Sequence, residues 1–166
     1  NEEKAQVRLN PTGPQHAQVA ALAGITEYFD ALHRHHFGHD KGNRHTRAKA
    51  VFELVARHES TLANILLDYL NDSPDIRLLG QDQAAPGQRA ATVAFHARAM
   101  PSAVIAKKLA DHGIGVGAGD FYARRCVEAL GIAPDDGVVR VSMVHYNTSE
   151  EVERLVTVLD DILKGV

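Results

Sequence analysis

The sequence contains one cysteine, no tryptophan, few other aromatic residues and no long apolar run. Because Cys126 has no second cysteine to pair with, a disulfide within the chain is excluded and a reducing, cytoplasmic compartment is favoured. The 21 acidic and 18 basic residues are interleaved, so the sequence contains no basic stripe that could bind along a nucleic-acid backbone. No apolar run approaches the ~20 residues that span a bilayer, and no signal-peptide pattern opens the chain. We therefore expect a soluble protein that binds neither nucleic acid nor membrane.

The length and composition predict one folded domain. With 166 residues, 45% of them hydrophobic, the chain can bury one sizeable core, and we expect a single domain over residues 1–166. Residues 1–14 read as an extended lead-in, because two prolines and a glycine oppose helix formation there. The polar start, without an initiator methionine, fits a fragment of a longer chain and a trimmed polypeptide equally well.

Hydrophobic periodicity predicts alternating helices and strands. We expect helices over residues 16–33, 46–69, 101–112, 120–130 and from 149 onward, and strands over 76–80, 90–96, 114–119 and 138–143. In the first helix, Val19, Leu22 and Ile25 belong to a stripe that is predicted to be buried. This order predicts an α+β fold: a two-layer small domain in which a mostly antiparallel sheet is covered by helices on one face.

Arg140 interrupts the apolar pattern of the last predicted strand. Val139, Val141 and Met143 alternate with Arg140 and a serine, so the guanidinium projects from the face opposite the core. Thr148 and Glu151 form a capping-box pattern that starts the final helix. A planar guanidinium fixed on a sheet suits bidentate binding of a small carboxylate. The alternative is an arginine of an edge strand that only faces solvent.

Residues 140–155, Arg-Val-Ser-Met-Val-His-Tyr-Asn-Thr-Ser-Glu-Glu-Val-Glu-Arg-Leu, resemble the C-terminal signature of the class V aminotransferase and cysteine desulfurase-like family of pyridoxal-phosphate enzymes. The resemblance implies that this chain is the C-terminal small domain of a fold-type I enzyme, and that Arg140 binds the α-carboxylate of an amino-acid substrate. It also implies pyridoxal 5'-phosphate as cofactor, a large cofactor-binding domain in the same chain and a homodimer when complete. The segment around Thr12 resembles the family's Gly-Thr-Pro segment, which makes Thr12 the candidate for contacting the cofactor phosphate, although a gap-free alignment places Gly13 there.

The groups that would react with the cofactor are not expected in this chain. Pyridoxal-phosphate chemistry needs a Schiff-base lysine, and no lysine falls in a segment that resembles the family's lysine motif. The lysines lie on polar loops, exposed helix positions or a terminus: Lys4, Lys41, Lys49, Lys107, Lys108 and Lys164. We therefore assign no catalytic residue, and expect the chain alone to be inactive and not to hold the cofactor.

Residues 114–123 resemble the loop that, in dedicated cysteine desulfurases, holds a second arginine and the sulfur-accepting cysteine. Gly117 stands at the place of that arginine and Tyr122 at the place of the cysteine, while Cys126 lies about one helical turn further on. Transamination, epimerisation and a lyase reaction such as desulfuration therefore stay open.

Two other interpretations concern the histidine-rich segment and the whole chain. Residues 33–45 contain several histidines, but glycines make the segment a flexible connection, and we predict solvated side chains and no metal site. For the whole chain, the alternative is a stand-alone α+β module that binds an amino acid or mediates dimerisation without catalysis.

Overall fold

The computed structural model describes residues 13, 15–38 and 42–165. Thr12, Lys4 and Lys41 lie outside the described residues, as does nearly all of the lead-in predicted over residues 1–14. The helices are α2 (His16–Phe37), α3 (Arg44–Asp72), α4 (Ser102–Asp111), α5 (Arg124–Ala129) and α6 (Ser149–Lys164), and the strands are β1 (Ile76–Leu79), β2 (Thr92–Ala97), β3 (Gly117–Gly119) and β4 (Val138–Ser142). Residues 1–53 and 54–166 form two compact units. The single domain expected over residues 1–166 stays a prediction.

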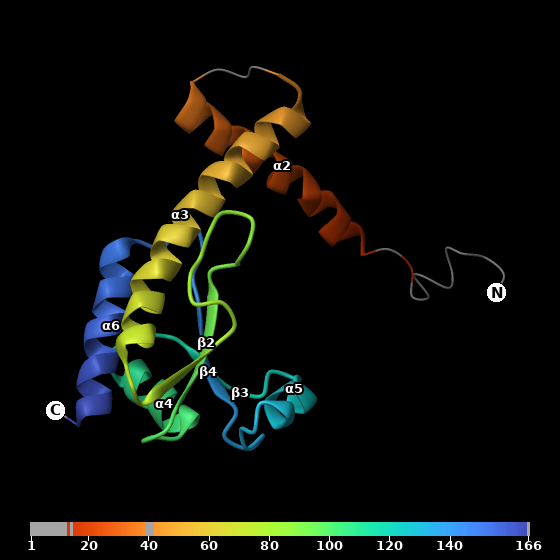
Figure 1. Cartoon of the computed structure of the whole chain (residues 1–166). Helices are drawn as coiled ribbons and strands as arrows, with labels where there is room; N and C mark the ends of the chain where they lie inside the picture. Colours follow the sequence, from red (N-terminus) through yellow and green to blue (C-terminus); the bar gives the residue numbers. More distant parts are fainter. Residues whose placement is uncertain (1–12, 14, 39–41, 166) are drawn as a thin grey trace. The chain divides into compact units, whose positions relative to one another are not determined.

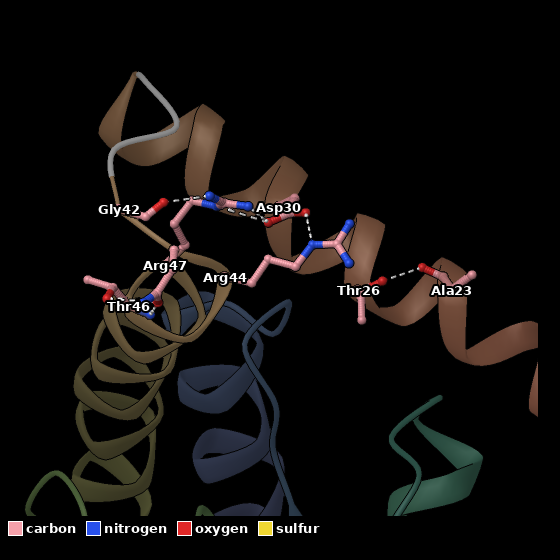
Figure 2. Close-up of polar contacts among 8 residues, drawn as sticks. Ala23, Thr26, Asp30, Gly42, Arg44, Thr46 and Arg47 are labelled. Carbon is pink, nitrogen blue, oxygen red and sulfur yellow. Dashed lines mark hydrogen bonds and ion pairs between the residues drawn. The ribbon is translucent and has the colours of Figure 1, made fainter.

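In the first unit, polar contacts tie α2 to the beginning of α3 (Figure 2). Asp30 Oδ1 accepts hydrogen bonds from Arg47 Nε at 3.1 Å and from Nη2 at 2.9 Å. Arg44 Nε lies 3.6 Å from the other carboxylate oxygen of Asp30. The rings of Phe29 and Phe52 add an aromatic contact with centroids 4.9 Å apart. Because the Arg47 and Asp30 side chains are only 13% and 17% exposed, solvent screens this pair less than an ordinary surface ion pair.

The buried stripe predicted for α2 is wrong at three of its positions. Val19, Leu22 and Ile25 are each more than half exposed, at 56%, 56% and 52%. Among the described residues of this unit, the beginning of α3 is the element that packs on α2, and one helix cannot cover the whole apolar stripe.

The second unit contains a four-stranded antiparallel sheet with the order β1-β2-β4-β3 (Figure 1). β4 pairs with β2 on one side and with β3 on the other, so it is an inner strand. The chain therefore folds as the α+β small domain that the sequence predicted.

One face of the sheet packs against α3, α4 and α6. On β4, Val139 and Val141 are buried while Arg140 and Ser142 are exposed, as a period-two strand requires. The core consists of residues from both layers that are each less than a tenth exposed: Leu62, Leu66, Leu67 and Leu70 of α3, Val93 and Phe95 of β2, Ile105 and Leu109 of α4, Val139 and Val141 of β4, and Val152, Leu155 and Leu159 of α6.

A smaller apolar cluster covers part of the other face. Val138 precedes Arg140 by two residues and thus shares its face, and it packs with Val127 of α5 and Ile132. Phe121 is partly buried against these three side chains. The second face is therefore apolar and covered beside Val138, and it is open at Arg140.

The segment that joins β3 to α5 differs from the sequence prediction. The strand expected over 114–119 is hydrogen-bonded only over Gly117–Gly119, and the helix expected over 120–130 is confined to Arg124–Ala129. Both predictions are too long. Phe121 and Tyr122 have φ values of 50° and 61°, which a right-handed helix does not allow.

Candidate functional site around Arg140

Arg140 lies at the middle of the open sheet face, between two small cross-strand neighbours. Ala94 of β2 and Gly117 of β3 are its register partners. The side chains of these neighbours are a methyl group and a hydrogen atom, so they leave room for the long arginine side chain on this face of the sheet. The period-two placement of Arg140 away from the core is confirmed, and the alternative of an edge-strand arginine is wrong because β4 is an inner strand.

An aromatic ring contacts the guanidinium group of Arg140. Arg140 Cζ lies over the Phe121 ring, 4.0 Å from the ring centroid, which is the geometry of a cation–π contact. Gly117 makes this arrangement possible, because a Cβ at that position would lie 2.9 Å from two carbon atoms of the Phe121 ring. The glycine on β3, the ring and the guanidinium therefore form one packed group.

The turn that carries Phe121 has an unusual backbone. Phe121 and Tyr122 are consecutive non-glycine residues in the left-handed region, a conformation that costs of order 1–2 kcal/mol per residue. Asp120 holds the turn in place: its Oδ1 accepts a hydrogen bond from the Tyr122 N–H at 3.1 Å, and its backbone carbonyl accepts one from the Ala123 N–H at 2.8 Å. Tyr122 itself is completely exposed. Such strain persists only where surrounding contacts hold it, and it occurs most often at functional sites.

The charge of Arg140 is not neutralised by a carboxylate within the described part of the chain, where its recorded partner is the Phe121 ring. A guanidinium donates hydrogen bonds in its own plane, while an aromatic ring contacts its face. Within the described part of the chain the Arg140 guanidinium makes no hydrogen bond, so its N–H groups are available to a carboxylate from outside the chain.

The helix cap predicted beside the strand is confirmed. Thr148 Oγ1 accepts a hydrogen bond from the Glu151 N–H at 3.3 Å, and Glu151 Oε2 accepts one from the Thr148 N–H at 3.1 Å. Asn147 Nδ2 also donates to Glu151 Oε2 at 3.0 Å. These bonds to the charged carboxylate, from Asn147 first and from the Thr148 backbone second, lower the pKa of Glu151.

A pocket of about 190 Å³ lies between this cap and the glycine-rich segment before β3. Ser142, Met143 and Gly115 line it, but Arg140 does not. Arg140 and Ser142 are both exposed, but the pocket begins one residue beyond Arg140 along β4.

A polar network that sequence analysis missed joins β2, α4 and the turn before β4. Asp136 Oδ2 lies 3.0 Å from His96 Nε2, and its Oδ1 accepts a hydrogen bond from the Ser102 N–H at 2.7 Å. The Ser102 hydroxyl donates to the carbonyl of Gly137 at 3.4 Å rather than to the histidine. Because the Ser102 hydroxyl does not hydrogen-bond to His96, the histidine cannot take its proton as it would in a catalytic serine–histidine–aspartate triad. The contacts of Asp136 instead stabilise the start of α4. No spacing pattern in the sequence links residues 96, 102 and 136.

The residues present do not fit a pyridoxal-phosphate site by themselves. Each lysine in the described ranges lies exposed on a helix: Lys49, Lys107, Lys108 and Lys164. Lys49 is near Glu53 and Lys164 is paired with Asp160 at 2.7 Å, so neither is presented to a cofactor. Thr12 cannot be placed because it lies outside the described residues.

In the described part of residues 33–45, His33 is buried, so the solvated side chain predicted at this position is wrong. His33 is 6% exposed and its ring stacks on Phe37, with centroids 4.9 Å apart. Among the described residues, no group of three or more histidine, cysteine or acidic side chains is arranged to hold a metal ion. The helices of the described ranges are also too short or too polar to cross a membrane.

The chain matches a known protein family over most of its length. The family model Aminotransferase class-V matches residues 37–155. Over 117 residues the chain is 37% identical to the aminotransferase-like protein FGM3 of Gibberella zeae. This alignment covers 69% of the present chain and 29% of FGM3. Over 115 residues it is 35% identical to the cysteine desulfurase-like protein ustD of Aspergillus flavus, covering 68% and 26%.

Solved structures give the same fold. The apo structure of a cysteine desulfurase from Thermococcus onnurineus superposes with a TM-score of 0.57 at 28% identity, covering 68% of this chain and 26% of that chain. The cysteine desulfurase CsdA of Escherichia coli gives a TM-score of 0.54 at 25% identity, covering 76% and 27%. The chain thus spans less than a third of the length of each of these relatives.

Proposed function

Because the chain belongs to the aminotransferase class-V family, we propose that it is the C-terminal small domain of a longer pyridoxal-phosphate-dependent enzyme that acts on an amino acid. In this proposal Arg140 binds the carboxylate of the substrate. The complete enzyme is a cytoplasmic homodimer whose large domain supplies the Schiff-base lysine and most of the cofactor site, while Thr12 contacts the cofactor phosphate.

The observation that carries the proposal is the state of Arg140. The residue stands on an inner strand, on the open face of the sheet, between the small residues Ala94 and Gly117. Its Cζ lies over an aromatic ring and, among the described residues, the guanidinium is not paired with a carboxylate. A charged group placed in this way and left without an anionic partner is suited to an anionic ligand, and a bidentate carboxylate matches its planar fork.

The proposal includes a restriction on the reaction. A phenol cannot form a persulfide, and Tyr122 occupies the position where the resemblance to dedicated desulfurases places a cysteine. We therefore propose transamination, epimerisation or a lyase reaction, with cysteine desulfuration as a weak activity at most.

Steady-state kinetics with the complete polypeptide test the role of Arg140. The substrates are the best L-amino acid of a panel and the amine that corresponds to it without the carboxylate. A charge-assisted hydrogen-bonded pair is worth about 1.5–3 kcal/mol, so Arg140→Ala should raise KM for the amino acid roughly 10- to 100-fold. Arg140→Lys should recover part of this loss, because it keeps the charge but not the fork.

Two controls make the outcome decisive. The amine should be processed equally well by the wild type and by Arg140→Ala, since it has no carboxylate to bind. Arg125→Ala removes the same charge from an exposed position of α5 and should leave both KM values unchanged. If Arg140→Ala affected the amine and the amino acid equally, the carboxylate role would be refuted.

A further inference from the structure

We propose that Phe121 is a positioning residue for Arg140: its ring holds the guanidinium in the orientation that receives the substrate carboxylate, and the turn at residues 120–123 holds the ring. This inference rests on the proposed function, because it assigns a purpose to the orientation of Arg140.

The long side chain of Arg140 needs an external constraint to hold one orientation. An arginine side chain has several rotatable bonds, and fixing them when a ligand binds costs conformational entropy. Ala94 and Gly117, its neighbours on the adjacent strands, are too small to restrict it. The Phe121 ring, whose centroid lies 4.0 Å from Arg140 Cζ, is placed to supply this constraint. The guanidinium N–H groups make no hydrogen bond within the described part of the chain, so they stay free for a carboxylate.

The Phe121 ring is itself fixed from several directions. Phe121 packs on the cluster of Val127, Ile132 and Val138, and its backbone is held in the left-handed region by the hydrogen bonds of Asp120. Gly117 provides the space that the ring occupies, because a Cβ there would lie 2.9 Å from the ring. The position of the Phe121 ring on the Arg140 guanidinium thus depends on three features. They are the left-handed turn at Phe121 and Tyr122, the missing side chain at Gly117, and the apolar cluster under the ring.

The structure supplies two independent ways to remove the contact. Phe121→Leu keeps an apolar side chain against the cluster but removes the ring, and Phe121→Tyr restores a ring. Gly117→Ala keeps Phe121 and displaces it, since the added methyl group collides with the ring. Gly115→Ala is the matched control, because a Cβ at Gly115 meets nothing within 4 Å and, like Gly117, Gly115 has no positive φ.

The first measurement is the NMR signal of the Arg140 Nε–H group in the 166-residue chain. The Phe121 ring centroid lies 4.0 Å from Arg140 Cζ, and an aromatic ring shifts the signal of a proton held over its face to lower frequency. The shift should therefore be present in the wild type, Phe121→Tyr and Gly115→Ala. The shift should be lost in Phe121→Leu and Gly117→Ala. An unchanged signal in both of these variants would show that the ring does not hold the guanidinium, and would overturn the proposal.

The second measurement is KM in the complete polypeptide, with the amino acid and its carboxylate-free amine as substrates. Phe121→Leu and Gly117→Ala should each raise KM for the amino acid about 3- to 10-fold, leave kcat within about twofold, and leave the amine unaffected. Phe121→Tyr and Gly115→Ala should behave as the wild type. A merely structural role would lower kcat for both substrates and would refute the positioning role.

Failure of the positioning role and failure of the proposed function give different results. If Arg140→Ala raises KM for the amino acid but Phe121→Leu and Gly117→Ala do not, Arg140 binds the carboxylate without help from the ring, and only the positioning role is wrong. If Arg140→Ala itself has no selective effect on the amino acid, the proposed function is wrong and the positioning role is refuted with it.

Discussion

Tyr122 is completely exposed and follows Phe121 in a strained turn, and Cys126 is exposed on the helix that comes next. A persulfide can form only on a thiol, and the thiolate is the reactive form. Of these two side chains, therefore, only Cys126 is able to accept sulfur. Whether it does so decides between a desulfurase and the other reactions of the family.

We expect the complete polypeptide to release sulfide from cysteine only slowly, and Cys126→Ala to release it at the same rate. Sulfide production with cysteine as substrate and a reducing agent present measures both. A robust rate that disappears in Cys126→Ala would mean that Cys126 has taken over the sulfur-accepting role, and the interpretation of Tyr122 would then be incorrect.

The contact between β3 and the turn before β4 depends on a pair of glycines. A Cβ at Gly137, where φ is +64°, would lie 2.2 Å from the backbone carbonyl carbon of Gly119. Gly131 has a similar φ of +71°, but a Cβ there would meet nothing within 4 Å. The two positions therefore share the cost of the left-handed backbone and differ only in the steric contact.

We expect Gly131→Ala to reduce the free energy of unfolding by about 1–2 kcal/mol, which is the cost of placing alanine in the left-handed region. Gly137→Ala should reduce it by about 4 kcal/mol or more, because a clash with backbone is added. Urea denaturation of the purified variants measures both values. Equal losses would contradict the close approach of Gly137 to β3.

The hydrogen bonds of Glu151 at the N-terminus of α6 should make the free energy of unfolding depend on pH. The pKa of Glu151 is lowered from its ordinary value of 4.5, chiefly by the hydrogen bond from Asn147 and then by that from the Thr148 backbone. A lower pKa in the folded state means that this group stabilises the fold above the unfolded pKa, and that the contribution is lost as pH falls through the folded pKa.

The difference in urea midpoint between the wild type and Glu151→Gln should thus be largest near neutral pH and should shrink as the pH is lowered below about 4.5. In an Asn147→Ala background the pH-dependent part should be smaller, because the main cause of the shift is gone. A difference that grew as the pH fell would have the wrong sign and would exclude this role of the cap.

For the whole molecule, we predict that the 166-residue chain folds but has no catalytic activity. Its second unit has a core formed by both layers, which is what independent folding requires. The lysines of the described ranges are exposed on helices and do not fit a Schiff-base site. Mixing the chain with pyridoxal phosphate, reducing with borohydride and mapping the peptides should give no stoichiometric label on one lysine, whereas the complete polypeptide should be labelled outside these 166 residues.

The opposite result would be equally clear. Stoichiometric labelling of one lysine in this chain, accompanied by transaminase or lyase turnover, would place the catalytic centre in this part of the enzyme. The assignment as a C-terminal small domain would then have to be abandoned.

The sequence by itself determined the features that depend on local pattern. Alternation along residues 138–143 predicted the orientation of Arg140, and the spacing of Thr148 and Glu151 predicted the start of α6, because strand alternation and helix capping each depend on residues close together in the chain. The order of these local signals was also sufficient for the α+β fold class.

Only the tertiary structure decided which distant residues meet at Arg140. The left-handed backbone of Phe121 and Tyr122 could not be predicted, because aromatic residues seldom adopt it and a helix was the better local choice. The contact of Phe121 with Arg140, and the space left by Gly117, exist because β3 and β4 pair in one particular register. That register is set by the packing of the whole sheet, which no short segment of the sequence encodes.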